Sequence, residues 1–168
     1  MLELTVVEAE GPTVLQFEHS LLSLSKWESI HKRPFLTRTN QDAMGLLEYY
    51  ECMLVTPEVN TGIVYGLMPE QFDALANYIS ESQTATTVPS DESARNNEII
   101  TSELIYWWMA SLQIPFQPCE SWHLSRLMKL IEVGAFKSQP EDKRKKVDLR
   151  AKWREMSERN RARFNSEG

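Results

Sequence analysis

The chain has 168 residues, of which 42% are hydrophobic and 25% are charged, so it can form one globular domain with a core. The net charge of −6 is unevenly distributed. Residues 137–168 carry 11 basic and 6 acidic side chains, whereas residues 1–136 carry 7 basic and 18 acidic ones. An acidic body, 1–136, therefore precedes a basic arm, 137–168. This composition excludes a uniformly basic nucleic-acid binder, a collagen-like chain and a fully disordered chain.

Neither a membrane segment nor a disulfide framework is indicated. The longest apolar run, 104–110, has seven residues, whereas a membrane-spanning helix needs about 20. The first ten residues contain three glutamates and no basic residue, unlike a signal peptide. Cys52 and Cys119 are too few for a disulfide framework, and we expect reduced, partly buried thiols. The sequence thus predicts a soluble intracellular protein.

The N-terminal segment alternates apolar and polar residues, which is the pattern of a half-buried strand. Its apolar side chains are Leu2, Leu4 and Val6. Gly11-Pro12 is a turn signal, and residues 13–17 can form a second strand. The sequence therefore predicts a small N-terminal β-hairpin.

Three helices are predicted to follow the hairpin, because apolar side chains recur at spacings of three and four. They cover residues 20–32, 41–55 and 69–80. Ser20 is the expected cap of the first helix, and Pro34 follows its end. The connection over 82–96 is rich in Ser, Thr and Ala, and it is the longest loop that we expect.

Two further helices are predicted over 98–113 and 119–133. Asn96 or Asn97 is the expected cap of the first, and Gly134 is the expected end of the second. We expect the two helices to form an antiparallel pair at the core of the fold.

Apolar groups lie on nearly all sides of the helix over 98–113, which is typical of a central, buried helix. Its Trp107-Trp108 pair is therefore interpreted as core packing. The predicted fold class is mainly α. It comprises a compact helical domain with a short N-terminal β-hairpin, followed by an extended basic C-terminal helix over 137–168.

No residue pattern predicts catalysis or a bound metal. The motifs of phosphate-binding loops, dinucleotide-binding turns, serine hydrolases and zinc proteases do not occur. Cys119 and His123 are four residues apart on a predicted helix, but zinc needs about four ligands, so Cys52 and His31 would have to complete the site. We expect a buried thiol and a capping or hydrogen-bonded histidine instead. The sequence thus predicts a non-enzymatic protein with no catalytic residue, cofactor or metal site.

The arm is the predicted partner-binding element, because basic residues gather at its start and sparse apolar residues run along it. The predicted partner-binding residues are Lys143, Arg144, Lys145, Lys146, Leu149, Arg150, Trp153, Met156 and Phe164. Three interpretations stay open: docking into a hydrophobic protein groove or onto the acidic body of a second copy, contact with nucleic-acid phosphates, and a solvated helix. Protein docking is favoured, because six interleaved acidic residues repel phosphate.

Two stretches of the sequence resemble small proteins that are encoded by long-tailed bacteriophages. They are F-E-H-S-L-L-S-L-S-K-W-E-S-I-H-K-R-P-F over 17–35 and E-I-I-T-S-E-L-I-Y-W-W-M-A-S-L-Q-I-P-F-Q-P-C-E-S-W-H-L-S-R-L over 98–127. The order of the predicted elements is similar as well, so the resemblance covers most of the chain. The family that the chain resembles is that of the tail assembly chaperones.

The resemblance implies a non-enzymatic role in tail morphogenesis, in the cytoplasm of the infected host. Such a chaperone keeps the long, helical tape measure protein soluble and helps tail-tube protein to polymerise around it. The implied partners are tape measure and tail-tube proteins, with self-association as an option and without nucleic acid or membrane. Two alternatives stay open, namely a virion structural protein of the neck or tail and a nucleic-acid-binding accessory protein.

Overall fold

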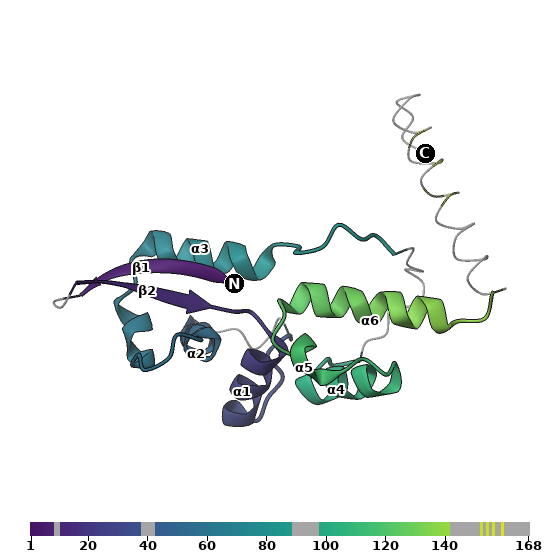
Figure 1. The fold of residues 1–168 in the computed structure, drawn as a ribbon, viewed down its shortest axis with the longest axis horizontal. Helices are drawn as coiled ribbons and strands as arrows, with labels where there is room; N and C mark the ends of the chain where they lie inside the picture. The colour runs from purple at the N-terminus through teal and green to yellow at the C-terminus, as the bar shows by residue number, and fades with distance from the viewer. Residues whose placement is uncertain are drawn as a thin grey trace.

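The structure, a computed structural model, describes residues 1–8, 11–37, 43–88 and 98–141, together with residues 152, 154, 156 and 159. Its elements are β1 (Leu2–Glu8), β2 (Gly11–Phe17), α1 (Leu21–His31), α2 (Ala43–Met53), the 3-10 helix η2 (Thr61–Gly66), α3 (Pro69–Ser80), α4 (Ser102–Ser111), α5 (Phe116–Cys119) and α6 (Leu124–Ser138). The described chain is thus helix-rich with an N-terminal hairpin, as the sequence predicts. Figure 1 shows α3 running along β1 on one side of the hairpin and α2 on the other, with α4, α5 and α6 grouped beyond its end.

The hairpin is antiparallel, and its register follows the alternation of the sequence, with Leu4 opposite Leu15. Because side chains alternate between the two faces of a strand, Leu15 and Phe17 are both fully buried. The residues after α2 extend the pairing, since the Val55 N–H donates to the Gln16 carbonyl at 2.9 Å. The outer edge of β2 is therefore partly covered by its own chain.

α1 begins and ends close to the predicted positions. Ser20 Oγ accepts a hydrogen bond from the Ser23 N–H at 3.2 Å and so caps the helix. The helix ends at Lys32, whose φ of 53° lies in the left-handed region. Trp27 is buried in the helix centre, and its indole N–H donates to the Gly45 carbonyl at 2.9 Å. This bond satisfies the buried indole and joins α1 to α2.

α2 lies within its predicted range, and α3 matches the predicted bounds, with Pro69 at its first position. The Gln71 side chain accepts the Met68 N–H at 2.8 Å and donates to the Thr5 carbonyl of β1 at 2.9 Å. This side chain therefore caps α3 and holds it along the strand. After α3, residues 82–88 form neither helix nor strand, while 89–96 of the expected loop lie outside the described residues.

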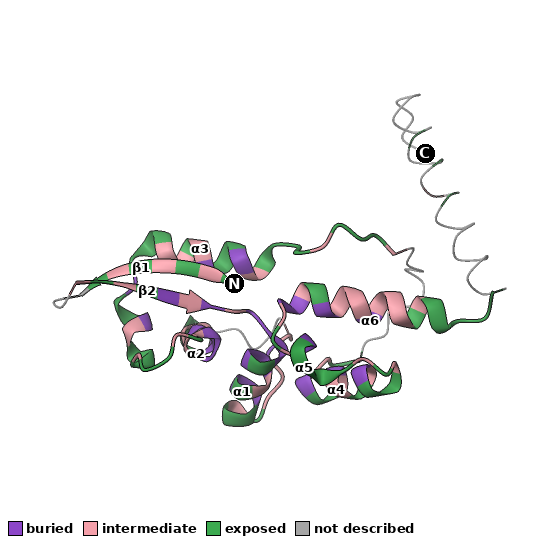
Figure 2. Cartoon of the chain, viewed as in Figure 1, coloured by how far each residue is buried: buried purple, intermediate pink, exposed green. Residues whose placement is uncertain are grey.

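A single core is built from side chains of β2, α1, α2, α3, α4 and α6. Its fully buried members include Leu15, Phe17, Leu21, Leu24, Tyr49, Met53, Leu75, Ile105, Met109 and Leu127. Figure 2 shows buried residues on β2, α1 and α2 as well as on the later helices. The prediction that the helices over 98–113 and 119–133 form the core is therefore too narrow, because most of these side chains come from earlier elements.

α4 begins later than predicted, and the expected cap at Asn96 or Asn97 is wrong. The helix starts at Ser102, where the hydroxyl of Thr101 accepts the N–H of Leu104 at 3.4 Å. The residues just before it, 98–101, have no regular structure. The physical reason is a contact between the first residue of α4 and Glu28, which is distant in sequence.

The buried carboxylate of Glu28 fixes the start of α4. Its Oε2 accepts the Ser102 N–H at 2.7 Å, and its Oε1 accepts the Phe35 N–H at 3.0 Å. Ser102 is the first residue of α4, so the carboxylate satisfies a backbone donor that has no partner within the helix. The negative charge also lies at the positive end of the helix dipole. One side chain of α1 therefore anchors both the loop after α1 and the first turn of α4.

α6 begins at Leu124, five residues later than predicted, and it continues through Gly134 to Ser138. The prediction that Gly134 ends this helix is wrong. A Cβ at position 134 would come within 3.1 Å of the Leu112 side chain, which directly follows α4. Gly134 therefore permits a close approach between this helix and the end of α4.

Replacing Glu28 with glutamine tests the anchor of α4. The amide keeps one acceptor oxygen but sets an NH₂ group against the other backbone N–H, so one buried donor loses its partner. We expect the free energy of unfolding to fall by about 1–3 kcal/mol. Glu3→Gln on the exposed face of β1 is the matched control, with an expected change below about 0.5 kcal/mol. Denaturant unfolding measures both variants, and equal changes would contradict the anchoring role.

Candidate functional site

An apolar groove of about 430 Å³ lies between α4 and α6, which run side by side in Figure 1. Its lining side chains are Trp107, Trp108, Ser111, Leu112, Met128, Ile131, Glu132 and Ala135. Only Ser111 and Glu132 are polar in this set. The groove therefore suits the apolar side of a partner better than it suits a charged ligand.

Helical periodicity places the lining residues on one face of each helix. They occupy positions 107, 108, 111 and 112 on one wall, and 128, 131, 132 and 135 on the other, at spacings of three and four. Another face of α4 carries Ile105 and Met109, which are fully buried in the core. α4 therefore has two apolar faces, one inside the core and one in the groove.

The tryptophan pair of α4 is not a core pair. Trp107 is 63% exposed, whereas Trp108 is half-buried and packs against the core. The prediction of core packing is therefore wrong for Trp107. The sequence did contain a signal of this second surface, because the helix is apolar on more sides than one core face uses. A large apolar side chain that stays exposed beside an apolar groove is a feature of interaction sites.

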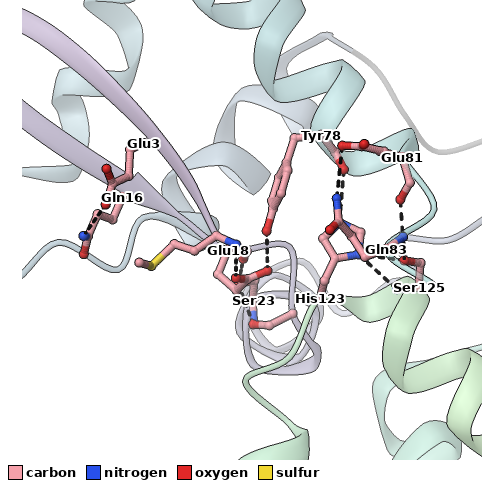
Figure 3. Close-up of polar contacts among 11 residues, drawn as sticks. Glu3, Gln16, Glu18, Ser23, Tyr78, Glu81, Gln83, His123 and Ser125 are labelled. Carbon is pink, nitrogen blue, oxygen red and sulfur yellow. Dashed lines mark hydrogen bonds and ion pairs between the residues drawn. The ribbon is translucent and has the colours of Figure 1, made fainter. Parts of the chain in front are cut away.

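His123 fixes the start of the α6 wall. Its Nε2 lies 3.0 Å from the Tyr78 carbonyl at the end of α3, and its Nδ1 accepts the Ser125 N–H at 3.3 Å. Because a carbonyl oxygen can only accept, Nε2 carries the proton and Nδ1 is the acceptor that caps α6. Figure 3 shows His123 between Tyr78 and Ser125. The sequence prediction of a capping, hydrogen-bonded histidine is confirmed.

His19 lies against His123, with 5.1 Å between the ring centroids. Its Nδ1 is 2.6 Å from the Tyr49 hydroxyl, and its backbone carbonyl accepts the Leu124 N–H at 2.7 Å. Burial, with a smaller contribution from His123, lowers the pKa of His19 to about 3, so the ring is neutral at physiological pH. The fold thus brings together two histidines that lie far apart in sequence, and both hold the start of α6.

Glu18 links α3 to the β2–α1 junction next to this histidine pair. The Tyr78 hydroxyl donates to Glu18 Oε1 at 2.7 Å, and the Ser23 hydroxyl donates to the Glu18 carbonyl at 2.7 Å, as Figure 3 shows. Burial and the neighbouring Glu18 carboxylate raise the pKa of Tyr78, so its hydroxyl keeps the proton that it donates. The polar side chains in this region therefore connect β2, α1, α3 and α6 to one another.

Cys119 and His123 do not share a helix, because Cys119 belongs to α5 and His123 precedes α6. Both Cys52 and Cys119 are buried, free thiols. Within the described ranges, no group of three or more His, Cys, Asp or Glu side chains could hold a metal ion. The same part of the chain contains no helix with the length and apolar character needed to cross a bilayer.

The predicted partner-binding residues of the arm fall mostly outside the described residues. Those outside are Lys143, Arg144, Lys145, Lys146, Leu149, Arg150, Trp153 and Phe164. Met156 is described, and it is helical and 39% exposed. The groove between α4 and α6 was not among the predicted site residues, since it forms only when two helices from different parts of the chain pack together.

The groove offers binding surface rather than reactive groups. Its one ionisable side chain, Glu132, forms an ion pair with Lys129 at 2.5 Å. Comparisons with protein-family models, with curated proteins and with solved structures find no match to the chain. The aliphatic and aromatic side chains of the groove have the chemistry to receive the apolar face of a helix.

His19 makes the stability of the fold depend on pH. Its pKa of about 3 in the folded chain lies below the ordinary value of 6.5, so between these values the unfolded chain binds more protons. The contribution of His19 is fully present above pH 6.5 and is lost as the pH falls toward 3, at about 1.4 kcal/mol per pH unit. We expect His19→Gln to lose stability less steeply between about pH 6 and about pH 4. Urea unfolding at several pH values measures the free energy of unfolding of both proteins. The same dependence on pH in the variant and in the unchanged chain would contradict the role of His19.

The exposed tryptophan of the groove should be dispensable for folding. Trp107→Ala removes a side chain that is 63% exposed, so we expect the free energy of unfolding to change by less than about 1 kcal/mol. Trp27→Ala removes a tryptophan that is 1% exposed and should destabilise the fold by about 3–5 kcal/mol. Guanidinium unfolding of the two variants provides the comparison. A loss of several kcal/mol in Trp107→Ala would show that this side chain belongs to the core.

Proposed function

We propose that the chain is a tail assembly chaperone of a long-tailed bacteriophage and that it binds amphipathic helices of tape measure and tail-tube proteins. The single observation that carries the proposal is the exposed apolar groove between α4 and α6, with Trp107 on its α4 wall. The resemblance of residues 17–35 and 98–127 to phage proteins supports the same context. The proposed role is non-enzymatic and takes place in the cytoplasm of the infected host.

The groove has the properties that a holding chaperone needs. It is concave and apolar, and its α4 and α6 walls are anchored at their starts by Glu28 and His123. An amphipathic helix can lay apolar side chains at positions i, i+3, i+4 and i+7 into such a groove. A tape measure protein is long and helical, so it presents faces of this kind many times along its length.

The acidic body supplies the charge that such complexes need to stay apart. Residues 1–136 carry a net charge of −11. Net charge far from zero keeps a protein soluble through mutual repulsion, and it does the same for a complex that carries an apolar client. Apolar contact with the client in the groove and charge repulsion between the bodies of different complexes therefore both serve the proposed function.

Ala135 allows the groove to be blocked without removing any core side chain. Ala135→Arg places a charged side chain among the lining residues, and we expect capture of co-expressed tape measure protein to weaken at least about tenfold. Ala110→Arg is the matched control, since Ala110 is an exposed alanine of α4 outside the lining. Co-purification from cells that express both proteins measures the difference.

Three results would contradict the proposal. The unchanged chain could fail to capture tape measure protein, Ala135→Arg could capture it normally, or Ala110→Arg could weaken capture as strongly. Mass spectrometry of purified virions adds a separate test. A chaperone leaves the assembled tail, so abundance of the chain in mature particles would indicate a structural protein of the neck or tail instead.

A further inference from the structure

We infer that in the absence of a client the groove of each chain is filled by the basic arm of a second copy, so that two chains exchange arms. The interface would join the apolar stripe of the arm, defined here as Leu149, Trp153 and Met156, to the groove between α4 and α6. Four features of the chain support this assignment: an apolar stripe, a matching length, opposite charge and the closure of a two-fold pair.

The stripe is apolar, and its spacing fits one face of a helix. Its three members are spaced by four and three residues, which places them on one face of a helix. Met156 is the member that the structure describes, and it is helical and 39% exposed. Apolar anchors at i, i+4 and i+7 are the pattern that a hydrophobic groove accepts from a helix.

The stripe and the groove have the same length. The stripe covers eight residues, and its ends, Leu149 and Met156, are seven positions or about 10 Å apart along a helix. The α6 wall of the groove runs from Met128 to Ala135, which are again seven positions and about 10 Å apart. One stripe would therefore fill one groove from end to end.

The charges around the two surfaces are opposite. The arm carries a net charge of +5 and the body −11. Lys152 adjoins the stripe and is exposed, while Glu103 lies exposed one helical turn before Trp107 on α4. A hydrogen bond from its own backbone lowers the pKa of Glu103, so this carboxylate is charged. Attraction between an arm and the body of another chain is therefore favoured over contact between like parts.

The symmetry of a two-fold pair favours a second copy as the occupant of the groove. α6 forms one wall of the groove and contains the first two residues of the arm, and the rest of the arm follows it in sequence. A two-fold arrangement brings two grooves and two arms together, so each stripe and each groove finds a partner at once. The exposure of Met156 within its own chain agrees with this arrangement.

Exchange of arms would regulate the site that we propose for clients. The arm would cover the groove, including Trp107, until a client helix displaces it. This displacement step rests on the proposed function, whereas the exchange between two chains does not. The two can therefore be tested separately, the exchange with purified protein alone.

Sedimentation equilibrium of the full-length chain tests the exchange from the side of the arm. We expect a dimer, and we expect Trp153→Ser combined with Met156→Ser to raise its dissociation constant at least about tenfold. The matched control combines Glu158→Ser with Arg161→Ser. These two positions fall on the other side of a helix and leave the net charge unchanged, so the dissociation constant should stay within about twofold.

A mixing experiment tests both halves of the interface together. Ala135→Arg blocks the groove and keeps the arm, whereas the double serine variant keeps the groove and alters the arm. Each should be monomeric alone, and an equimolar mixture should form a one-to-one heterodimer, since one intact arm meets one intact groove. Ala110→Arg should behave like the unchanged chain. Cooperative unfolding of every variant verifies that it is folded.

Several outcomes would overturn the inference. The unchanged chain could be monomeric, as expected if the arm fills the groove of its own chain. The dimer could stay intact in both variants, or the mixture of the two variants could stay monomeric. The control variants could also weaken the dimer as strongly as the test variants do. If the chains exchange arms but do not capture tape measure protein, the inference of a dimer holds and the proposed function is wrong. If a monomeric chain captures tape measure protein, the proposed function holds and the inference of a dimer is wrong.

Discussion

The structure depends on the buried hydrogen bonds that tie the two ends of α1 to the starts of α4 and α6. Glu28 accepts the N–H of the first residue of α4 at 2.7 Å. Just before α1, the His19 carbonyl accepts the N–H of Leu124, the first residue of α6, at 2.7 Å. Buried polar groups are unfavourable unless they are paired, so these bonds fix where both helices begin. Gly134 then permits their close approach, and the groove is the space that this arrangement leaves between them.

α4 shows how one short helix contributes to the core and to a surface at the same time. Ile105 and Met109 are fully buried in the core, whereas Trp107 is mostly exposed, so we expect it to contribute little to the stability of the fold. Charge is divided in a similar way, because residues 1–136 carry a net charge of −11 while the groove is lined mostly by apolar side chains. Folding and the proposed binding thus depend on different faces, and each can be altered without the other.

Much of the fold could be predicted from local signals, such as the alternation of the hairpin, the cap at Ser20 and the position of Pro69. The start of α4 could not, because it is set by Glu28, which lies 74 residues before Ser102 in sequence. Gly134 was predicted to end its helix, because a glycine often does so and the sequence does not reveal which side chain packs against it. The only sequence signal of the candidate site is that α4 is apolar on more sides than one core face uses. The second wall, α6, could not be predicted, because it meets α4 only in the folded chain.

We propose above all that the groove between α4 and α6 binds the apolar face of a helix. Methyl NMR of the methionines tests it directly, because Met128 lines the groove while Met44 and Met68 are exposed elsewhere. A peptide of residues 142–164 would be added to the full chain whose own arm carries the two serine substitutions. We expect the Met128 signal to shift and saturate while Met44 and Met68 stay unchanged. An unchanged Met128 signal, or equal shifts at all three, would contradict the claim.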